Sequence, residues 1–530
     1  MKKSNVFAIA SCFISAFVLL MICSRSSFLY PCNDWNDANS YFTMGKGMMN
    51  GQVIYRDLYD QKGPYLYFLY GLAYLFSHDT FAGVFLLELV AVGLFLYFGY
   101  RTLCLYLREK TALLCVPVLA AVMLSSKSFY WGGAAEEFML PLFGFSLLSS
   151  LRYFKEEYPK GKDEGKPGLP MLFLNGILAG VVMLVKYTML GFYFAWMAMM
   201  AFAFLLKKDL KGALKGCLVF LSGMGIAALP WLFYLGINGA LIAFYECYIY
   251  NNIFLYSNLT DSDNGIFQRI YDLVKLLYWL ILDNLWYFAL IILGVGALLL
   301  SRKSKWIEKL NVLMLCGFLF LGIFVGGSVL PYYSIPLMTF TVLGMIPVGL
   351  GIQKAVSICG RRKAGTTLGS GPAGTAPGSG QGTLVTRQKA VFGAAFLLLL
   401  AAGSLFAYHK SMNTYFMDQP KEEYFLYKFK AVMEEEEQPT LLNVGCLDAG
   451  LYTVADVVPV CRFFQTNGIG FETMFTEQER YIREGLTDFV LVRNDWVPEN
   501  IEVKYEKVAE EPYAWDGKEF VYTLYKRRNN

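Results

Sequence analysis

VFAIASCFISAFVLLMIC, residues 6–23, is an apolar run of the length that crosses a membrane, since a spanning helix needs roughly 20 such residues. A polar and aromatic loop follows it, with the stretches NDANSY (36–41), GQVIYRD (51–57) and DQKGP (60–64). Long apolar runs and charged loops then alternate along the chain. This alternation predicts a helical protein that crosses the membrane many times.

The composition supports this interpretation. Of the 530 residues, 56% are hydrophobic and 17% are charged, whereas soluble domains are typically about a quarter charged. Many apolar runs also reach the roughly 20 residues that a spanning helix needs, which excludes a large soluble enzyme. The net charge of +4 is small, and its lysines and arginines lie between the apolar runs, which indicates membrane topology rather than nucleic-acid binding.

We expect about eleven spanning helices by the length rule. The first segment could instead be a signal peptide, but no clear cleavage site follows it. Residues 64–77 are apolar but too short to span comfortably, so we expect a juxtamembrane or re-entrant helix there. The expected spans lie near residues 6–24, 80–100, 112–127, 137–153, 170–186, 188–206, 214–236, 274–300, 310–327, 332–352 and 390–408.

The distribution of lysine and arginine predicts the orientation. With Lys2 and Lys3 inside, every second loop collects further basic residues, and the remaining loops hold fewer. We therefore expect a cytoplasmic N-terminus. The segments that this places outside the cell membrane are 25–79, 127–136, 237–273 and 409–530.

Two domains are expected. Residues 1–408 form the membrane module, in which 25–79 is the first outer loop and 353–389 is a flexible cytoplasmic linker, because 364–383 are rich in Gly, Ser, Thr, Pro and Ala. Residues 409–530 are richer in charge and carry short strand-like runs at 440–444, 489–492 and 520–524, with a helical stretch at 477–484. This pattern predicts a small extracytoplasmic α/β domain.

Cysteine and histidine give little indication of a metal site. The 11 cysteines are scattered without zinc-ligand spacing, and only two histidines are present. Cys446 and Cys461 both lie in the outer domain and could form a disulfide. The acidic run 434–437 is expected to be a solvated helix end. No cofactor is required by any pattern, although carboxylates could recruit a divalent metal ion.

The first outer loop carries the candidate catalytic carboxylates. A carboxylate at the membrane surface is costly unless it faces water or a partner. Asp37 begins a helical pattern, so it could be a helix cap, a catalytic group or both; whether Asp34 or Asp37 is the main carboxylate stays open. Lys62 lies two residues before a helix start at Pro64. Its ammonium could bind a lipid phosphate or anchor the helix at the interface.

These stretches resemble the first outer loop of the GT-C glycosyltransferases, most of all the bacterial relatives of protein O-mannosyltransferases and of the lipid A aminoarabinose transferase. The resemblance implies that Asp37 is the catalytic carboxylate, although Ala38 stands where the family often has Glu. It also implies that Asp60 and Lys62 match an Asp-x-Lys-Pro-Pro segment, with Gly63 for the first Pro, and that Lys62 holds the donor phosphate. Tyr41 and Tyr55 of the same pattern are expected at the substrate.

Further residues fit the same outer site. Glu136 and Glu137 stand at the outer end of a span and resemble the second acidic site of the family, although acids at a helix start are also favoured by its dipole. An ionisable residue at the edge of a span indicates a functional site by default. Tyr332 and Tyr333 could line the cavity or belong to an interfacial aromatic belt. The basic residues expected to bind the phosphate are Lys186 and Arg269.

The resemblance implies an inverting glycosyltransferase that moves a sugar from a polyprenyl-phosphate donor to a protein, cell-wall polymer or lipid outside the membrane. Asp37, Asp60 and Glu136 are the expected catalytic residues. A transporter or flippase of lipid-linked sugars is the alternative; it would favour repeated halves with broken helices, and we find no repeat. A third interpretation is a receptor or scaffold that acts through its outer domain.

Overall fold

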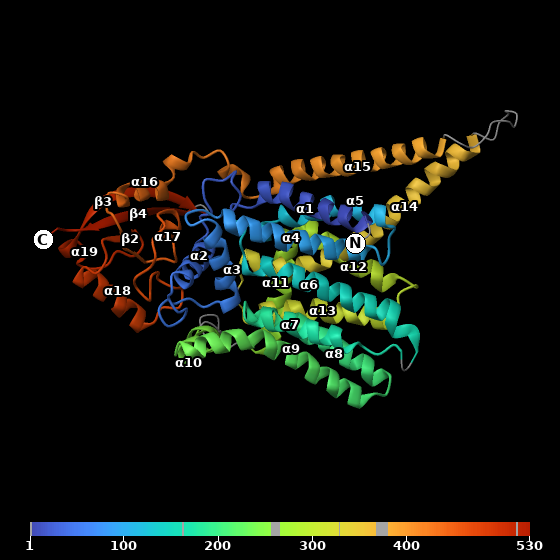
Figure 1. Cartoon of the computed structure of the whole chain (residues 1–530), viewed down its shortest axis with the longest axis horizontal. Helices are drawn as coiled ribbons and strands as arrows, with labels where there is room; N and C mark the ends of the chain where they lie inside the picture. Colours follow the sequence, from blue (N-terminus) through green and yellow to red (C-terminus); the bar gives the residue numbers. More distant parts are fainter. Residues whose placement is uncertain are drawn as a thin grey trace.

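The protein is a long bundle of helices with a small sheet domain at one end (Figure 1). A computed structural model describes residues 3–161, 164–255, 265–327, 329–366, 380–515 and 518–529. The N-terminal end of the first helix lies toward the end of the molecule that is remote from the sheet. The predicted polytopic helical fold with a C-terminal α/β domain is confirmed.

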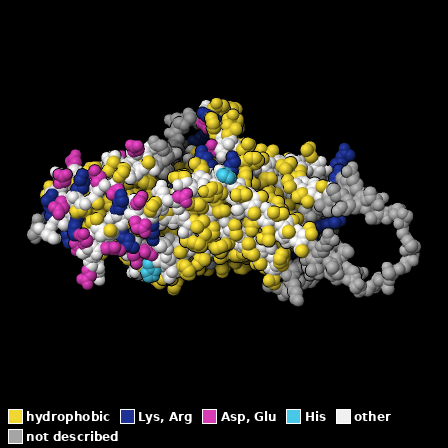
Figure 2. Space-filling model, turned by 90° about the horizontal axis from the view of Figure 1, so that it is seen from above, with side chains coloured by type: hydrophobic (Ala, Val, Ile, Leu, Met, Phe, Trp, Pro, Cys, Tyr) yellow, Lys and Arg dark blue, Asp and Glu magenta, His cyan; other side chains and the backbone are white. Residues whose placement is uncertain are grey.

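Long apolar helices build the bundle. Large apolar side chains on their outer faces are exposed, as in Leu218 (68%) and Phe233 (71%). They form a broad apolar surface in Figure 2, whereas charged side chains gather over the sheet domain. An apolar surface of this extent is typical of contact with lipid. The helices are α1 (Lys3–Cys23), α4 (Ala82–Leu103), α5 (Glu109–Leu124), α6 (Ala135–Arg152), α7 (Leu169–Met183), α8 (Gly191–Leu206), α9 (Leu210–Ile237), α12 (Leu285–Leu300), α13 (Trp306–Phe324), α14 (Thr341–Thr366) and α15 (Gly380–Lys410).

The expected count of eleven spans is not confirmed. In the described part of the chain, seven helices are long and apolar enough to cross a membrane, or eight if one bent pair is a single span. Two expected spans are short, since α5 has 16 residues and α7 has 15. A third, α6, carries Glu136, Glu137 and Arg152 within its 18 residues.

The expected span at 274–300 is broken. The chain bends by 113° between helix α11 (Ile266–Asp283) and helix α12. The break falls at Asn284, whose side-chain oxygen accepts hydrogen bonds of 3.0 Å from both the amide and the hydroxyl of Ser128. This polar anchor sits between two apolar helices, so the chain turns there instead of continuing straight.

Two short helices follow α1 in the first loop. Helix α2 (Asn36–Met49) begins after Trp35, so Asp37 is its second residue rather than its cap. Helix α3 (Pro64–Phe76) begins at Pro64, as predicted, because proline suits the first turn of a helix. The two helices pack closely, since a Cβ atom on Gly45 would lie 2.4 Å from the amide nitrogen of Gly71.

The C-terminal domain contains a four-stranded sheet with the order β1-β2-β4-β3. Strands β1 (Leu441–Val444) and β2 (Phe489–Arg493) pair in parallel, and β4 (Lys518–Arg527) pairs antiparallel with β2 and with β3 (Tyr505–Trp515). The three predicted strands are confirmed. Strand β3 was missed because it is a polar edge strand with four Lys or Glu residues and a proline. The helices of this domain are α16 (Phe425–Met433), α17 (Leu451–Val454), α18 (Glu472–Glu484) and α19 (Ile501–Lys504).

Two further expectations about the outer part and the linker need correction. Cys446 and Cys461 are both free, buried thiols, so the disulfide is not formed. Both belong to the buried core, as cysteine commonly does. The ends of the expected linker at 353–389 belong to α14 and α15, and residues 367–379 lie outside the described residues. The acidic run 434–437 follows the end of α16 and is exposed, as predicted.

The sheet domain docks on the first loop through buried polar contacts. The ammonium of Lys46 donates to the carbonyl of Tyr452 at 2.8 Å and pairs with Asp456 at 2.8 Å. The hydroxyl of Thr43 donates to Asp448 at 2.6 Å. Because α2 lies between the sheet domain and the bundle (Figure 1), these contacts hold the loops of the sheet domain over the end of the bundle.

Candidate functional site

A cavity of about 530 Å³ lies where the first loop, the ends of several bundle helices and the sheet domain meet. Its walls include the turn at η4 (Tyr187–Leu190), the irregular helix η5 (Tyr245–Leu255), the end of α13 and the start of η7 (Pro331–Phe340). The predicted site residues that line it are Asp37, Tyr41, Asp60, Lys62, Lys186, Tyr332 and Tyr333. The structure therefore brings together seven of the eleven predicted residues.

Asp37 is half-buried at the start of α2. The hydroxyl of Tyr332, from η7, donates a hydrogen bond to its carboxylate. A carboxylate in the first turn of a helix is stabilised by the helix dipole. Asp37 is therefore an oriented anion at the edge of the cavity, able to accept a proton or a hydrogen bond from a ligand.

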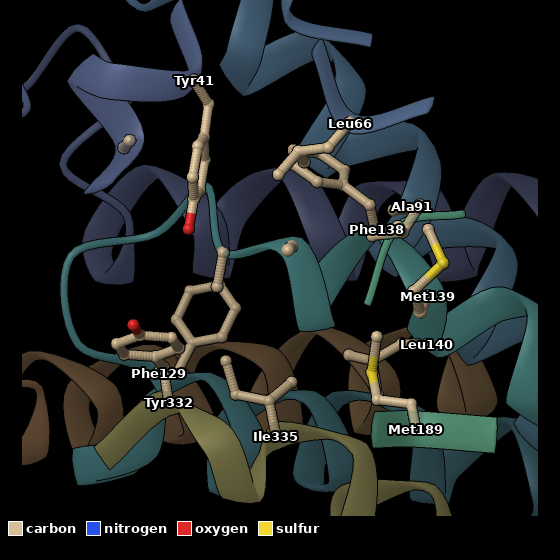
Figure 3. Packing of buried hydrophobic residues seen from close by; sticks show 14 of the residues in the cluster. Tyr41, Leu66, Ala91, Phe129, Phe138, Met139, Leu140, Met189, Tyr332 and Ile335 are labelled. Atoms are coloured by element: carbon tan, nitrogen blue, oxygen red, sulfur yellow. The ribbon is translucent and has the colours of Figure 1, made fainter. Parts of the chain in front are cut away.

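Aromatic rings form the wall beside Asp37. Figure 3 shows Tyr41 of α2 and Tyr332 of η7 toward one side of the packed core, with Met139 and Leu140 toward the other. The hydroxyl of Tyr41 is buried and has no hydrogen-bond partner among the described residues. Buried polar groups are normally satisfied, so this hydroxyl at a cavity wall is a candidate contact for a ligand.

Asp60 lies in the first loop between α2 and α3, and the residue is only 5% exposed. The hydroxyl of Tyr67 donates to its carboxylate at 2.8 Å. Burial raises the pKa of Asp60, and the nearby Lys62 ammonium partly offsets this effect. Asp60 is thus a more confined carboxylate than Asp37.

Lys62 is positioned by contacts of its backbone. Its amide donates to the Tyr67 hydroxyl at 2.7 Å, and its carbonyl accepts from the Tyr55 hydroxyl at 2.8 Å. The next residue, Gly63, packs against the chain at Leu184, where a Cβ atom would lie 2.0 Å from the carbonyl oxygen. Glycine is required for this approach, which brings Lys62 close to the segment that carries Lys186.

The ammonium of Lys62 has no ion pair or hydrogen bond with any described residue. It lies 6.0 Å from the centre of the Tyr41 ring. Burial lowers the pKa of Lys62, but the charge of Asp37, the strongest of the opposing influences, helps to raise the pKa overall. Lys62 is therefore a positive charge that faces the cavity and can accept an anionic ligand.

Lys186 is held differently. It pairs with Glu136, and the two side chains are 11% and 2% exposed. Its ammonium also lies 3.3 Å from the centre of the Tyr333 ring, a cation–π contact. Glu136 itself does not line the cavity, but it acts on the wall of the cavity through Lys186.

Three other predicted residues do not line the cavity. Glu137 accepts a hydrogen bond from the amide of Gly133 at 3.0 Å and is fully buried in α6. Tyr55 is buried within the first loop and supports Lys62 through the hydrogen bond described above. Arg269 is exposed in the first turn of α11.

The structure places the two alternative carboxylates in different surroundings. Asp34 pairs with the buried guanidinium of Arg25 and accepts a hydrogen bond of 2.7 Å from the Tyr513 hydroxyl of the sheet domain. It does not line the cavity, whereas Asp37 does. Asp34 therefore links the first loop to the sheet domain.

Sequence analysis missed the uncharged polar residues of the cavity. Gln61, Asn252 and Asn467 all line it, together with Leu447 and Gly468 of the sheet domain. The only signal in the sequence was an asparagine pair, 251–252, within an aromatic segment. No group of three or more His, Cys, Asp or Glu side chains that could hold a metal ion is found within the described ranges.

Comparison with known proteins identifies the fold. The sequence matches no protein family and no curated protein. Among solved structures, it is similar to the archaeal oligosaccharyltransferase AglB from Archaeoglobus fulgidus in complex with an inhibitory peptide and a dolichol-phosphate, with 13% identity, 98% of this chain and 74% of that chain covered, and a TM-score of 0.51.

It is also similar to ArnT from Cupriavidus metallidurans, both bound to undecaprenyl phosphate (TM-score 0.55) and in the apo state (0.56). Both comparisons have 13% identity and cover 98% of this chain and 97% of that chain. The likeness confirms the predicted GT-C fold.

Proposed function

We propose that the protein is a membrane glycosyltransferase that moves a sugar from a polyprenyl-phosphate donor to an acceptor. The observation that carries this proposal is the Lys62 ammonium, which faces the cavity without an ionic partner in the described part of the chain. The solved structures of AglB and ArnT hold dolichol-phosphate and undecaprenyl phosphate, respectively. Their shared fold supports a lipid phosphate as the ligand of this lysine.

The phosphate would lie between the two lysines of the cavity. Lys62 provides an unpaired charge, and Lys186, held by Glu136, provides a second one. As the bond to the sugar breaks, negative charge develops on the leaving phosphate. Positive groups that are already oriented there stabilise the transition state, which is usually the largest catalytic effect.

The lipid tail would leave along the apolar side of the cavity. This side is formed by Val185, Ile323, Val325 and Leu330 at the ends of bundle helices, next to the exposed apolar surface. A polyprenyl chain can therefore remain among apolar side chains while its phosphate reaches the lysines.

Asp37 would act as the general base. An acceptor hydroxyl attacks the anomeric carbon, its proton passes to Asp37, and the carbon–oxygen bond to the phosphate breaks with its electron pair leaving on polyprenyl phosphate. A single displacement of this kind inverts the anomeric centre. A positioned base contributes roughly 10²–10⁴-fold. Asp60 would orient the acceptor through its confined carboxylate.

The proposed orientation places this cavity and the sheet domain outside the cell membrane and the N-terminus in the cytoplasm. It is supported by the basic loops of the sequence, and by the N-terminal end of α1 lying remote from the sheet. A lipid-carried donor suits such an outer site, because nucleotide sugars are cytoplasmic.

Sugar transfer that is catalysed by the purified protein in lipid nanodiscs tests the proposal. The protein is given a panel of polyprenyl-phosphate sugars together with peptide, glycan and lipid acceptors that carry hydroxyl groups, and release of polyprenyl phosphate is measured for the parent and for Asp37→Asn and Lys62→Gln. We expect release from at least one donor by the parent and a loss of about 10²-fold or more in Asp37→Asn. Binding or movement of these lipids without any release would favour the transporter alternative.

A further inference from the structure

Three carboxamide side chains meet at the cavity from separate parts of the chain. Gln61 belongs to the loop before α3, Asn252 to η5 and Asn467 to the sheet domain. The proposed roles of the lysines and carboxylates do not use them. We refer to them together as the carboxamide cluster.

Hydrogen bonds determine how the amide of Asn467 is oriented. Its side-chain oxygen accepts from the Gln61 side-chain nitrogen at 3.0 Å and from the amide of Ile469 at 3.3 Å. Two donors on this oxygen leave the amino group of Asn467 turned away from them. The same bond shows that Gln61 uses its nitrogen, so its side-chain oxygen stays available.

Asn252 is oriented in a similar way. Its side-chain nitrogen donates to the carbonyl oxygens of Gln61 and Tyr248, both at 2.9 Å. The side-chain oxygen of Asn252 is therefore available as an acceptor. The cluster as a whole presents two acceptors and one donor, none of which has a hydrogen-bond partner among the residues that the structure describes.

This set of atoms matches hydroxyl groups. A hydroxyl can donate to a carboxamide oxygen and accept from a carboxamide amino group, whereas a carboxylate only accepts and an ammonium only donates. The residues of the sheet domain that line the cavity, Leu447, Asn467 and Gly468, are all uncharged. A charged sugar substituent would find no counter-ion among the sheet-domain residues that line the cavity.

We infer that the carboxamide cluster is a sugar subsite that binds the hydroxyl groups of an uncharged sugar ring. The inference rests on the proposed function and adds the substrate class. It also gives the sheet domain a direct part in binding, because Asn467 supplies the donor of the cluster. The bound hydroxyls belong either to the donor sugar or to a sugar of the acceptor.

The isosteric variant Asn467→Asp tests this subsite. It keeps the oxygen that accepts from Gln61 and Ile469 but replaces the donor with an acceptor. Asn494→Asp is the matched control, since its side-chain oxygen accepts only a backbone bond of 3.0 Å from Val521 in the same domain. Binding to each full-length protein in nanodiscs is measured with three probes: undecaprenyl-phosphate hexose, undecaprenyl phosphate and a soluble methyl hexoside.

We expect Asn467→Asp to weaken binding of the lipid-linked hexose about tenfold and to leave undecaprenyl phosphate unchanged, which assigns the cluster to the donor sugar. Weaker binding of the methyl hexoside alone assigns it to the acceptor. Binding of both sugar probes that equals that of the parent and Asn494→Asp overturns the inference. If the parent binds neither lipid, the proposed function fails, and the methyl hexoside measurement still decides the subsite.

Discussion

The hydroxyl of Tyr332 donates a hydrogen bond to the carboxylate of Asp37, although 295 positions separate the two residues in the chain. The bond joins the first loop to η7 at the edge of the cavity. Trp35, directly before α2, packs edge-on against Tyr332, with 4.7 Å between the ring centroids. Tyr332 is therefore a positioning residue for the proposed base.

Tyr332→Phe keeps the ring but removes this bond. Hydrogen bonds to charged groups contribute about 1.5–3 kcal/mol, so we expect kcat for sugar transfer to fall about tenfold or more, with less loss than in Asp37→Asn. The measurement is polyprenyl phosphate release under saturating donor. A Tyr332→Phe protein as active as the parent would show that the bond does not orient Asp37 for catalysis.

Asp34→Asn separates the two carboxylates of the first loop. The change leaves the buried guanidinium of Arg25 without its ionic partner, and breaking a buried pair costs on the order of 3 kcal/mol. We expect a lower melting temperature but unchanged transfer per folded protein. Circular dichroism melting and the transfer assay measure the two effects. Loss of transfer with unchanged melting would instead place Asp34 in catalysis.

The sequence was sufficient for the fold class and for part of the charged site, whereas Glu137 and Arg269 lie away from the cavity. Long apolar runs define the bundle, and the pattern from Asp37 to Pro64 is local, so Asp37, Asp60 and Lys62 could be found together. The break at Asn284 depends on a distant partner, Ser128, and no local pattern reveals it.

The uncharged side of the cavity could not be predicted for the same reason. Asn467 reaches the cavity only because the sheet domain docks on α2 through contacts such as that of Lys46 with Tyr452. The disulfide prediction was wrong for a similar reason, because it relied only on the two cysteines sharing a domain. Cys446 and Cys461 are each buried as a free thiol.

The pair of Lys186 and Glu136 is expected to behave as a unit. Lys186→Met leaves a buried carboxylate unpaired, which costs about 3 kcal/mol. Adding Glu136→Gln removes that charge, so the double variant should recover most of the lost stability without recovering transfer. Melting temperatures of the parent, both single variants and the double variant form the required cycle. Additive losses in the double variant would show that the two side chains are not coupled.

We expect the docking of the sheet domain to depend on pH through Asp448, the buried carboxylate that accepts a hydrogen bond from Thr43. Burial raises the pKa of Asp448 to about 6 from its ordinary 3.8, with hydrogen bonds opposing the shift. The folded chain therefore holds a proton that the unfolded chain releases, and stability falls as the pH rises between about 4 and 6. At pH 7 the buried charge costs about 3 kcal/mol, since each unit corresponds to about 1.36 kcal/mol.

Asp448→Asn cannot ionise and keeps an oxygen for the amide of Gly450, which donates at 2.8 Å. We expect its melting temperature to exceed that of the parent at pH 7 and the difference to shrink toward pH 4. Comparing the two chains cancels the titration of all other groups. If both chains lose stability in parallel across this range, Asp448 is already ionised in the folded protein and the docking contact is a carboxylate throughout.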